Sequence, residues 1–194
     1  MTRVVVEISP SVDGYVAGEG VSVERPFGDA GQRLHRWLGF DGDPDPQDVA
    51  AAGRSFGAAG AVVIGRRMFD VGIAQWGPDG AFGLPVFVVT SRPEPDLVRG
   101  PTTFAFVTGG VRAAVERAGT AAGDREVVVG GGAAVVQQAL DAGLVDELRL
   151  HVVPVLLGRG TRLFERTPGA ELVPSGVVVT RNATHTTYRV ARPA

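Results

Sequence analysis

Hydrophobic positions along the first two thirds of the chain alternate between short β-branched runs and helical repeats. The runs that predict strands cover residues 4–8, 61–64, 85–90, 103–107 and 126–129. Apolar residues three and four positions apart predict helices between them, at Val111, Ala114, Val115 and Ala118 and again at Val135, Val136, Ala139 and Leu140. Strands that alternate with helices in this way are typical of a parallel sheet covered on both faces.

The C-terminal third has a different pattern. Leu148 and Leu150 alternate with Arg149 and His151, which predicts a half-buried strand over residues 146–153. Two further strands, at 177–180 and 186–191, follow without an intervening helix, so we expect the C-terminal edge of the sheet to be antiparallel. The pattern predicts a single α/β domain over residues 1–194, without an internal repeat.

Residues 18–47 interrupt this alternation with a stretch rich in Gly, Asp and Pro, in which Leu34, Trp37 and Leu38 predict one short helix. A long irregular insertion in a compact domain is usually a lid or a binding loop, and a solvated flap is the alternative. Asp48 is then expected to cap a helix, for which the apolar spacing predicts a buried face of Val49, Ala52, Phe56 and Ala59.

Composition narrows the chemistry. The chain has 194 residues with 19 basic and 21 acidic side chains, and it contains no cysteine. The absence of cysteine excludes disulfides and thiol nucleophiles. Every basic residue is arginine, which excludes lysine bases and the lysine of a P-loop. The three histidines, His35, His151 and His185, lie far apart in sequence, so we expect no metal site.

Charge and hydropathy give expectations about partners and location. A net charge of −2 gives no sign of nucleic-acid binding. The sequence has neither an apolar run long enough to span a bilayer nor a basic, then apolar, leader. We therefore expect a cytoplasmic protein that binds neither nucleic acid nor membrane.

Three successive strand ends carry residues suited to phosphate. They are Gly130, Gly131, Gly132 and Ala133; Gly65, Arg66 and Arg67; and Thr90, Ser91 and Arg92. Bare backbone at a helix N-terminus favours a pyrophosphate, and guanidinium groups bind phosphate oxygens. Close helix–strand packing, solvated arginines and an ordinary turn are the respective alternatives. No Gly-x-Gly-x-x-Gly follows the first strand, so the sequence lacks a Rossmann dinucleotide-binding motif. Arginines stand where that motif would have an acidic residue to hold the ribose 2′-hydroxyl, and arginines there favour the 2′-phosphate of NADP over NAD.

Several motifs together carry a family resemblance that spans nearly the whole chain. They are Ser11-Val12-Asp13-Gly14-Tyr15-Val16-Ala17, Val63-Ile64-Gly65-Arg66-Arg67, Val89-Thr90-Ser91-Arg92, Val129-Gly130-Gly131-Gly132, Leu144-Val145-Asp146-Glu147-Leu148, Val153-Pro154-Val155-Leu156-Leu157-Gly158-Arg159-Gly160 and Leu163-Phe164. In these the chain resembles the dihydrofolate reductase-like superfamily, and more closely a stand-alone bacterial form of the reductase domain of the riboflavin-biosynthesis deaminase/reductase.

The resemblance implies a dihydrofolate reductase-like three-layer α/β/α fold with a mixed, mostly parallel sheet. It also implies bound NADPH, hydride transfer to a pyrimidine or pterin-like substrate, and a homodimer. Carried over by position, Gly130, Gly131 and Gly132 cradle the pyrophosphate, and the neighbouring Gly65, Thr90 and Ala133 belong to the same turns. Arg66 and Arg67 meet cofactor phosphates, Ser91 and Arg92 the 2′-phosphate, and Val16 and Ala17 the nicotinamide ring.

Departures from the family pattern keep several hypotheses open. Met68 stands where such reductases commonly have threonine, Gly130 stands where the riboflavin enzymes have glutamate, and residues 18–47 do not match them. The leading hypothesis is an NADPH-dependent reductase of a small heterocycle, with 5-amino-6-(5-phosphoribosylamino)uracil as the first candidate. The alternatives are a dihydrofolate or other pterin reductase, and a non-catalytic nucleotide-binding module of the same fold.

The proton donor and the subunit interface are also open. Asp13 is the catalytic candidate nearest the nicotinamide loop, although a carboxylate in an Asp-Gly turn often bonds only its own backbone. His35 and Asp48 are the other candidates for the donor. Arg149 and His151 belong either to a partly exposed strand face or to a dimer interface.

Overall fold

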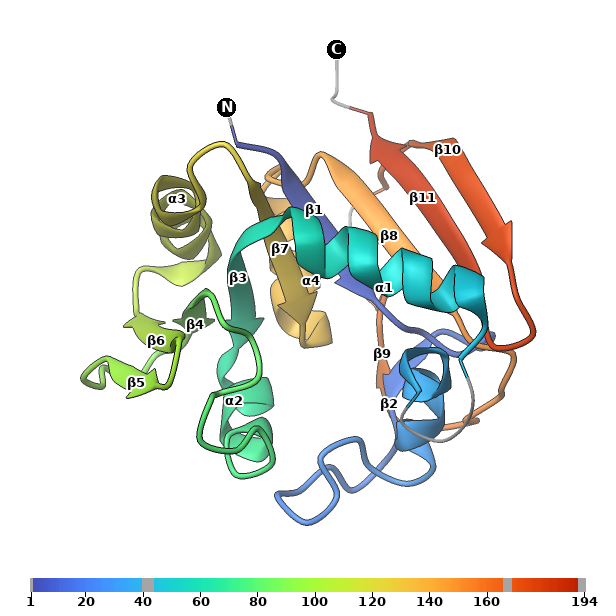
Figure 1. Cartoon of the computed structure of the whole chain (residues 1–194), viewed down its shortest axis with the longest axis horizontal. Helices are drawn as coiled ribbons and strands as arrows, with labels where there is room; N and C mark the ends of the chain where they lie inside the picture. The colour runs from blue at the N-terminus through green and yellow to red at the C-terminus, as the bar shows by residue number, and fades with distance from the viewer. Residues whose placement is uncertain (1, 40–43, 166–168, 192–194) are drawn as a thin grey trace.

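The computed structural model describes residues 2–39, 44–165 and 169–191. Its main element is a nine-stranded sheet with the order β10-β11-β8-β1-β7-β3-β4-β6-β5 (Figure 1). The strands of this sheet are β1 (Val4–Ile8), β3 (Ala59–Gly65), β4 (Pro85–Val89), β5 (Leu97–Arg99), β6 (Thr102–Val107), β7 (Glu126–Gly131), β8 (Glu147–Val152), β10 (Leu172–Val179) and β11 (Thr184–Val190). Two short strands, β2 (Tyr15–Ala17) and β9 (Thr161–Arg162), form a second sheet.

The strands from β8 to β6 run parallel, whereas both edges are antiparallel. β11 pairs with β8 and β10 pairs with β11 in antiparallel register, so the predicted C-terminal edge is confirmed. The other edge ends in β5, a three-residue antiparallel strand that the hydrophobic pattern did not predict. β2 and β9 were missed for the same reason, because two or three residues are too few to show a period.

Helices cover both faces of the sheet, which confirms the three-layer α/β/α fold (Figure 1). On one face, α3 (Gly110–Ala122) and α4 (Ala133–Asp141) pack on the valine-rich centre of the sheet. The other face carries α1 (Pro46–Ala58), α2 (Arg66–Gly72) and the 3-10 helix η1 (Gly31–Leu38), over two smaller hydrophobic clusters.

The predicted orientation of α1 is wrong. Its cap is Asp45, whose side chain accepts from the Gln47 N–H at 2.9 Å, while Asp48 completes the capping box from the first turn. Val49 and Phe56 are 56% and 67% exposed. The buried side of α1 is instead formed by Asp48, Ala51 and Ser55. The apolar spacing misled because the part of the sheet beneath α1 is polar, so the helix turns its small and polar side chains inward.

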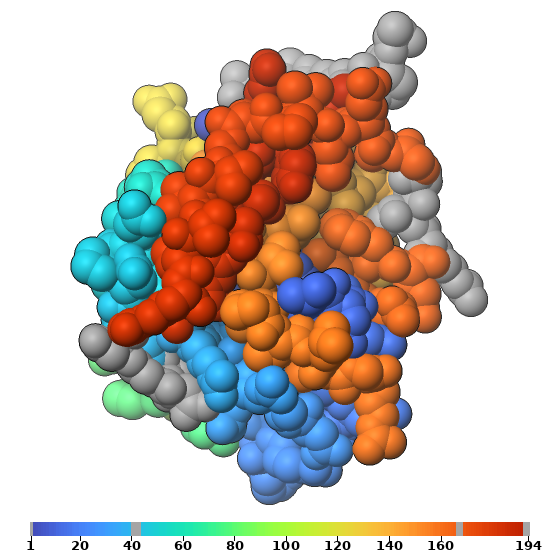
Figure 2. Space-filling model, turned by 90° about the vertical axis from the view of Figure 1, so that its right-hand side faces the viewer, coloured from blue at the N-terminus to red at the C-terminus, as the bar shows by residue number. Residues whose placement is uncertain are grey.

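The surroundings of β8 also differ from one of the two sequence interpretations. Leu148 packs under α4, as expected, but His151 on the opposite side is only 4% exposed. It therefore does not lie on an exposed strand face, whereas Arg149 on the same strand is partly exposed, and the dimer interface stays a prediction. The β10–β11 hairpin, red and orange in Figure 2, forms the outer surface at this end of the sheet.

The inverted α1 makes a direct stability prediction. Phe56→Ser is expected to change the free energy of unfolding by no more than about 0.5 kcal/mol, because the side chain is exposed. Asp48→Ala is expected to destabilise by about 3 kcal/mol, because it leaves buried hydrogen-bond partners unmatched. Urea denaturation of the two variants measures both, and a larger loss for Phe56→Ser than for Asp48→Ala would contradict the packing.

Candidate active site

A large cleft lies at the carboxyl ends of β1, β7, β3 and β4, the edge at which ligands bind in open α/β sheets. Its volume is about 860 Å³, within the usual range for small-molecule and cofactor sites. Among the described residues that line it, none is acidic. The lining includes nine of the predicted cofactor residues: Val16, Ala17, Gly65, Arg66, Arg67, Gly130, Gly131, Gly132 and Ala133.

The glycine turn between β7 and α4 forms the floor of the cleft. Gly131 has φ +133°, a backbone conformation that favours glycine, and its peptide bond to Gly132 is cis. A Cβ on Gly132 would meet no atom within 4 Å, so the main chain there faces open space. α4 begins at Ala133, and no side chain caps its N-terminus within the described part of the chain. Backbone N–H groups at such a terminus are suited to an anion.

The turn between β3 and α2 lies directly beside it. A Cβ on Gly65 would come within 3.5 Å of the Gly132 nitrogen, which shows how closely the two turns pack. Arg66 is already paired, with Asp70 at 2.6 Å and with Glu94 at 2.5 Å. Arg67 is exposed at the cleft and makes no ion pair with any described residue. Arg67 is therefore the guanidinium here that is available to a ligand.

The third predicted strand end lies just outside the cleft. Thr90, Ser91 and Arg92 are not among its lining residues, although Val89 before them is. Arg92 and Arg66 share one ion-pair partner, because both contact the carboxylate of Asp70. The distance from Arg92 to this carboxylate is 3.0 Å. Thr90 accepts from the Arg92 N–H at 3.0 Å, which is the ordinary-turn geometry.

Asp13 is held in a turn and is not part of the cleft lining. Its carboxylate accepts from the Ser11 hydroxyl at 2.6 Å and from the backbone N–H groups of Leu157 and Gly158 at 3.1 and 2.7 Å. The Ser11 hydrogen bond, with those of the two N–H groups, lowers the pKa of Asp13 to about 2. These bonds are those expected of a carboxylate that ties two loops together.

The insertion at 18–47 contributes one wall of the cleft through Val21, Pro26, Phe27 and His35. His35 on η1 packs against Phe27 with ring centroids 4.3 Å apart. Burial lowers the pKa of His35 to about 4, so the imidazole is neutral at pH 7. Of the three candidate proton donors, His35 is the one that lines the cleft. Asp48 lies on the buried side of α1, where its carboxylate contacts His185 Nε2 at 2.8 Å.

Sequence reasoning did not single out Ser9, Phe27 or Gln138 as individual lining residues. Ser9 accepts from the Trp37 indole N–H at 2.9 Å, a contact between residues 28 positions apart. No local pattern could have found it. Trp76 also lines the cleft, and its ring stacks on that of Phe104 with centroids 5.8 Å apart.

Comparison with protein families gives one match, to the RibD C-terminal domain, over residues 2–187. The chain belongs to this family. Membership supports a reductase of the riboflavin-pathway kind. A comparison with curated proteins finds no match.

Solved structures agree at the level of the fold. A putative riboflavin biosynthesis protein from Shewanella sp. PV-4 is 24% identical, with TM-score 0.72 over 99% of this chain and 100% of that chain. The Thermotoga maritima deaminase/reductase is 14% identical with TM-score 0.63, over 98% of this chain and 57% of that one. Dihydrofolate reductase from Enterococcus faecalis, complexed with NADP(H), is 18% identical with TM-score 0.56 over 98% and 97%.

No helix in the described ranges is long and apolar enough to cross a membrane. Those residues also contain no group of three or more His, Asp or Glu side chains arranged to hold a metal ion.

The low pKa of His35 predicts a pH-dependent stability. The unfolded chain binds a proton at this residue below about pH 6.5, but the folded chain does so only near pH 4, so stability falls as pH drops between these values. We expect the wild type to lose about 2 kcal/mol more than His35→Gln between pH 7 and pH 4.5, after allowance for the open cleft. Urea unfolding at both pH values measures this, and equal losses would contradict it.

Proposed function

We propose that the protein is an NADPH-dependent reductase that transfers a hydride to a small heterocyclic substrate. The observation that carries the proposal is the pair of adjacent strand-to-helix turns at Gly65 and Gly132, which present bare backbone and Arg67 to one cleft. Family membership supports the same chemistry. 5-Amino-6-(5-phosphoribosylamino)uracil is the first substrate candidate, and the predicted homodimer and cytoplasmic location remain part of the proposal.

The phosphate end of the cleft fits the cofactor. The uncapped N-terminus of α4 and the open space over Gly132 suit a pyrophosphate, with Arg67 as its counter-charge. Arg92 is 63% exposed and shares Asp70 with Arg66, so it supplies a guanidinium at the cleft rim for a 2′-phosphate. Asp70 and Glu94 already balance these two arginines, so the 2′-phosphate must compete with existing ion pairs.

The substrate end combines apolar walls with two polar groups. When bound, NADPH supplies the hydride. Val16, Val21 and Phe27 exclude water from this end, while Ser9 and His35 are the polar side chains that can orient a planar heterocycle. Neutral His35 holds one ring proton, which it can donate as a hydrogen bond to a substrate nitrogen or oxygen. This assigns His35, rather than Asp13, as the group that handles the proton.

Nucleotide titration tests the cofactor proposal. NADPH is expected to bind more tightly than NADH, and the change in nucleotide fluorescence on binding measures both affinities. Arg67→Ala is expected to weaken both nucleotides about tenfold, because it removes a charged contact to the shared pyrophosphate. Arg92→Ala is expected to weaken NADPH by a similar factor and leave NADH unchanged, because only NADPH carries the 2′-phosphate.

Arg99→Ala, on exposed β5 outside the cleft, is the matched control and should bind as the wild type does. Equal losses of NADPH and NADH in Arg92→Ala would remove the 2′-phosphate assignment. Failure of the wild type to bind either nucleotide would overturn the reductase proposal.

Turnover separates the remaining alternatives. A reductase consumes NADPH with a pyrimidine or a pterin, and the substrate that supports turnover distinguishes the riboflavin-type from the dihydrofolate-type activity. His35→Gln is expected to lower kcat at least tenfold with little change in NADPH affinity. Tight NADPH binding without turnover on any member of either class would favour the non-catalytic nucleotide-binding module.

A further inference from the structure

Four titratable side chains form a continuous row under α1, outside the cleft. Glu7 of β1 contacts His151 of β8, with 3.1 Å between Oε1 and Nε2. His151 contacts His185 of β11, with 2.7 Å between the two Nδ1 atoms. His185 in turn contacts Asp48 of α1, with 2.8 Å between Nε2 and Oδ1. All four side chains are at most 12% exposed.

The geometry fixes the number of protons in this row. Each of the three contacts needs one hydrogen, and an ionised carboxylate supplies none. Both Nε2 atoms must therefore carry hydrogens toward Glu7 and Asp48, and one of the two Nδ1 atoms must donate to the other. With Glu7 and Asp48 both ionised, three hydrogens on four ring nitrogens make one imidazolium and one neutral imidazole. Without the third, two lone pairs would face each other in a buried site.

The charge belongs on His151 rather than on His185. Burial lowers the pKa of His185, and the nearby Arg54 charge adds to this, against the hydrogen bond that His185 donates to the Asp48 carboxylate. His151 also has the better aromatic neighbour. The Trp37 ring stacks on it with centroids 4.1 Å apart and planes tilted by 31°, whereas Trp37 meets His185 edge-on at 5.1 Å. A cation over an indole face is stabilised by the ring quadrupole.

Most other charges around the row are paired, and the exception is Arg54 of α1, which lies near His185 and makes no ion pair with a described residue. Arg149 of β8 holds Glu126 of β7 at 2.9 Å and Glu147 at 2.7 Å, and lies 3.8 Å from the outer oxygen of Glu7. Asp48 also accepts from Asn182 at 2.7 Å and from Thr180 at 2.8 Å. Asp48 is thus held by several hydrogen-bond donors and Glu7 lies between His151 and Arg149, so we take both carboxyls as ionised and the histidine pair as the part that gains or loses a proton.

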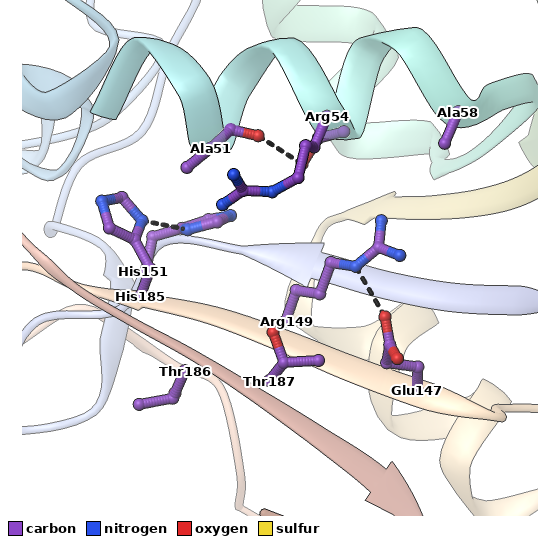
Figure 3. A pocket seen from close by; sticks show the side chains of 10 residues that line it. Ala51, Arg54, Ala58, Glu147, Arg149, His151, His185, Thr186 and Thr187 are labelled. Carbon is purple, nitrogen blue, oxygen red and sulfur yellow. Dashed lines mark hydrogen bonds and ion pairs between the residues drawn. The ribbon is translucent and has the colours of Figure 1, made fainter. Parts of the chain in front are cut away.

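A second cavity, of about 390 Å³, opens onto the histidine pair from the side away from the cleft (Figure 3). In Figure 3 the two rings lie at one end of this groove, with the side chains of Arg54 and Arg149 beside it. Neither histidine lines the cleft. Protons can therefore reach the pair from solvent without passing through the nucleotide site.

Trp37 connects the pair to the cleft. Its indole N–H donates to Ser9 Oγ at 2.9 Å, and Ser9 lines the cleft at the end of β1. Trp37 also lies on η1, two residues after His35. Stacking of Trp37 on His151 therefore fixes the position of η1. It also fixes the hydrogen bond that the Ser9 oxygen accepts, so the Ser9 hydroxyl hydrogen remains available to other partners.

We propose that His151 is held as an imidazolium between Glu7 and His185, and that Trp37 transmits this protonation state to Ser9 and His35 at the substrate end of the cleft. His151 and Trp37 are then positioning residues, whose catalytic meaning rests on the proposed reductase function. The arrangement is complete while the proton is present. It loosens as pH rises through the titration of the pair, because two bare nitrogens then face each other.

NMR of the ligand-free full chain labelled with 15N-histidine tests the first half of the proposal. The chain has only three histidines, and His35→Gln assigns one of them. One ring of the pair is expected to show two protonated nitrogens at pH 7. Glu7→Gln should lower its proton affinity tenfold or more, because it removes the adjacent negative charge. Glu116→Gln, the same change at an exposed position of α3 on the other face of the sheet, should leave the proton affinity of the pair unaltered.

Tryptophan fluorescence tests the second half. In a Trp76→Phe background Trp37 is the one remaining tryptophan, and its emission should rise with the same midpoint as the NMR titration, because imidazolium quenches indole more strongly than neutral imidazole. Two neutral rings from pH 5 to pH 9 would overturn the inference. Trp37 emission that does not change over the pH range of the NMR titration would also overturn it. If both signals behave as expected and neither nucleotide binds, the proposed function fails and the protonated pair stands.

Discussion

Parallel pairing of β1, β7, β3 and β4 is the constraint on which the rest of the structure depends. Parallel strands end at the same edge, so every turn that leaves a carboxyl end opens into the same space. The glycine turn after β7 and the arginine turn after β3 therefore meet, although some 65 residues separate them in sequence. With them, two helix N-termini point into one cleft that no described acidic side chain lines. Backbone N–H groups at helix N-termini are suited to an anionic group, which is the basis of the proposed nucleotide binding.

The two sides of the sheet serve different purposes. Beneath α3 and α4 the side chains are almost entirely aliphatic and supply the main hydrophobic core. Beneath α1 the strands carry Glu7, Glu126, Arg149 and His151, which are nearly all paired with one another. Buried charges cost free energy unless they are matched in this way, and they are seldom retained for stability alone. Their contact with Trp37, and through it with Ser9, connects this polar layer to the cleft.

The segment 18–47 is where this chain differs most from the family pattern, and residues 21–35 of it also contribute to one wall of the cleft. Phe27 and His35 come from this segment, while the glycine and arginine turns follow strands of the sheet. In the proposed function, cofactor binding and substrate choice thus reside in separate parts of the chain. Such a division lets the same sheet serve different substrates when one loop changes.

The sequence by itself determined the elements with strong periods: the central strands, α3, α4 and the glycine and arginine turns between them. Local hydrophobic spacing is enough there, because those elements bury an ordinary apolar face. It could not determine the orientation of α1, since Val49 and Phe56 have helical spacing yet face solvent over a polar sheet. Nor could it find the row from Glu7 to Asp48, or the turn that holds Asp13. Apart from the contact between His151 and His185, which are 34 positions apart, the contacts of Glu7, Asp48 and Asp13 with these partners and with Gly158 join residues more than 130 positions apart. Only tertiary packing decides which distant polar groups share a buried space.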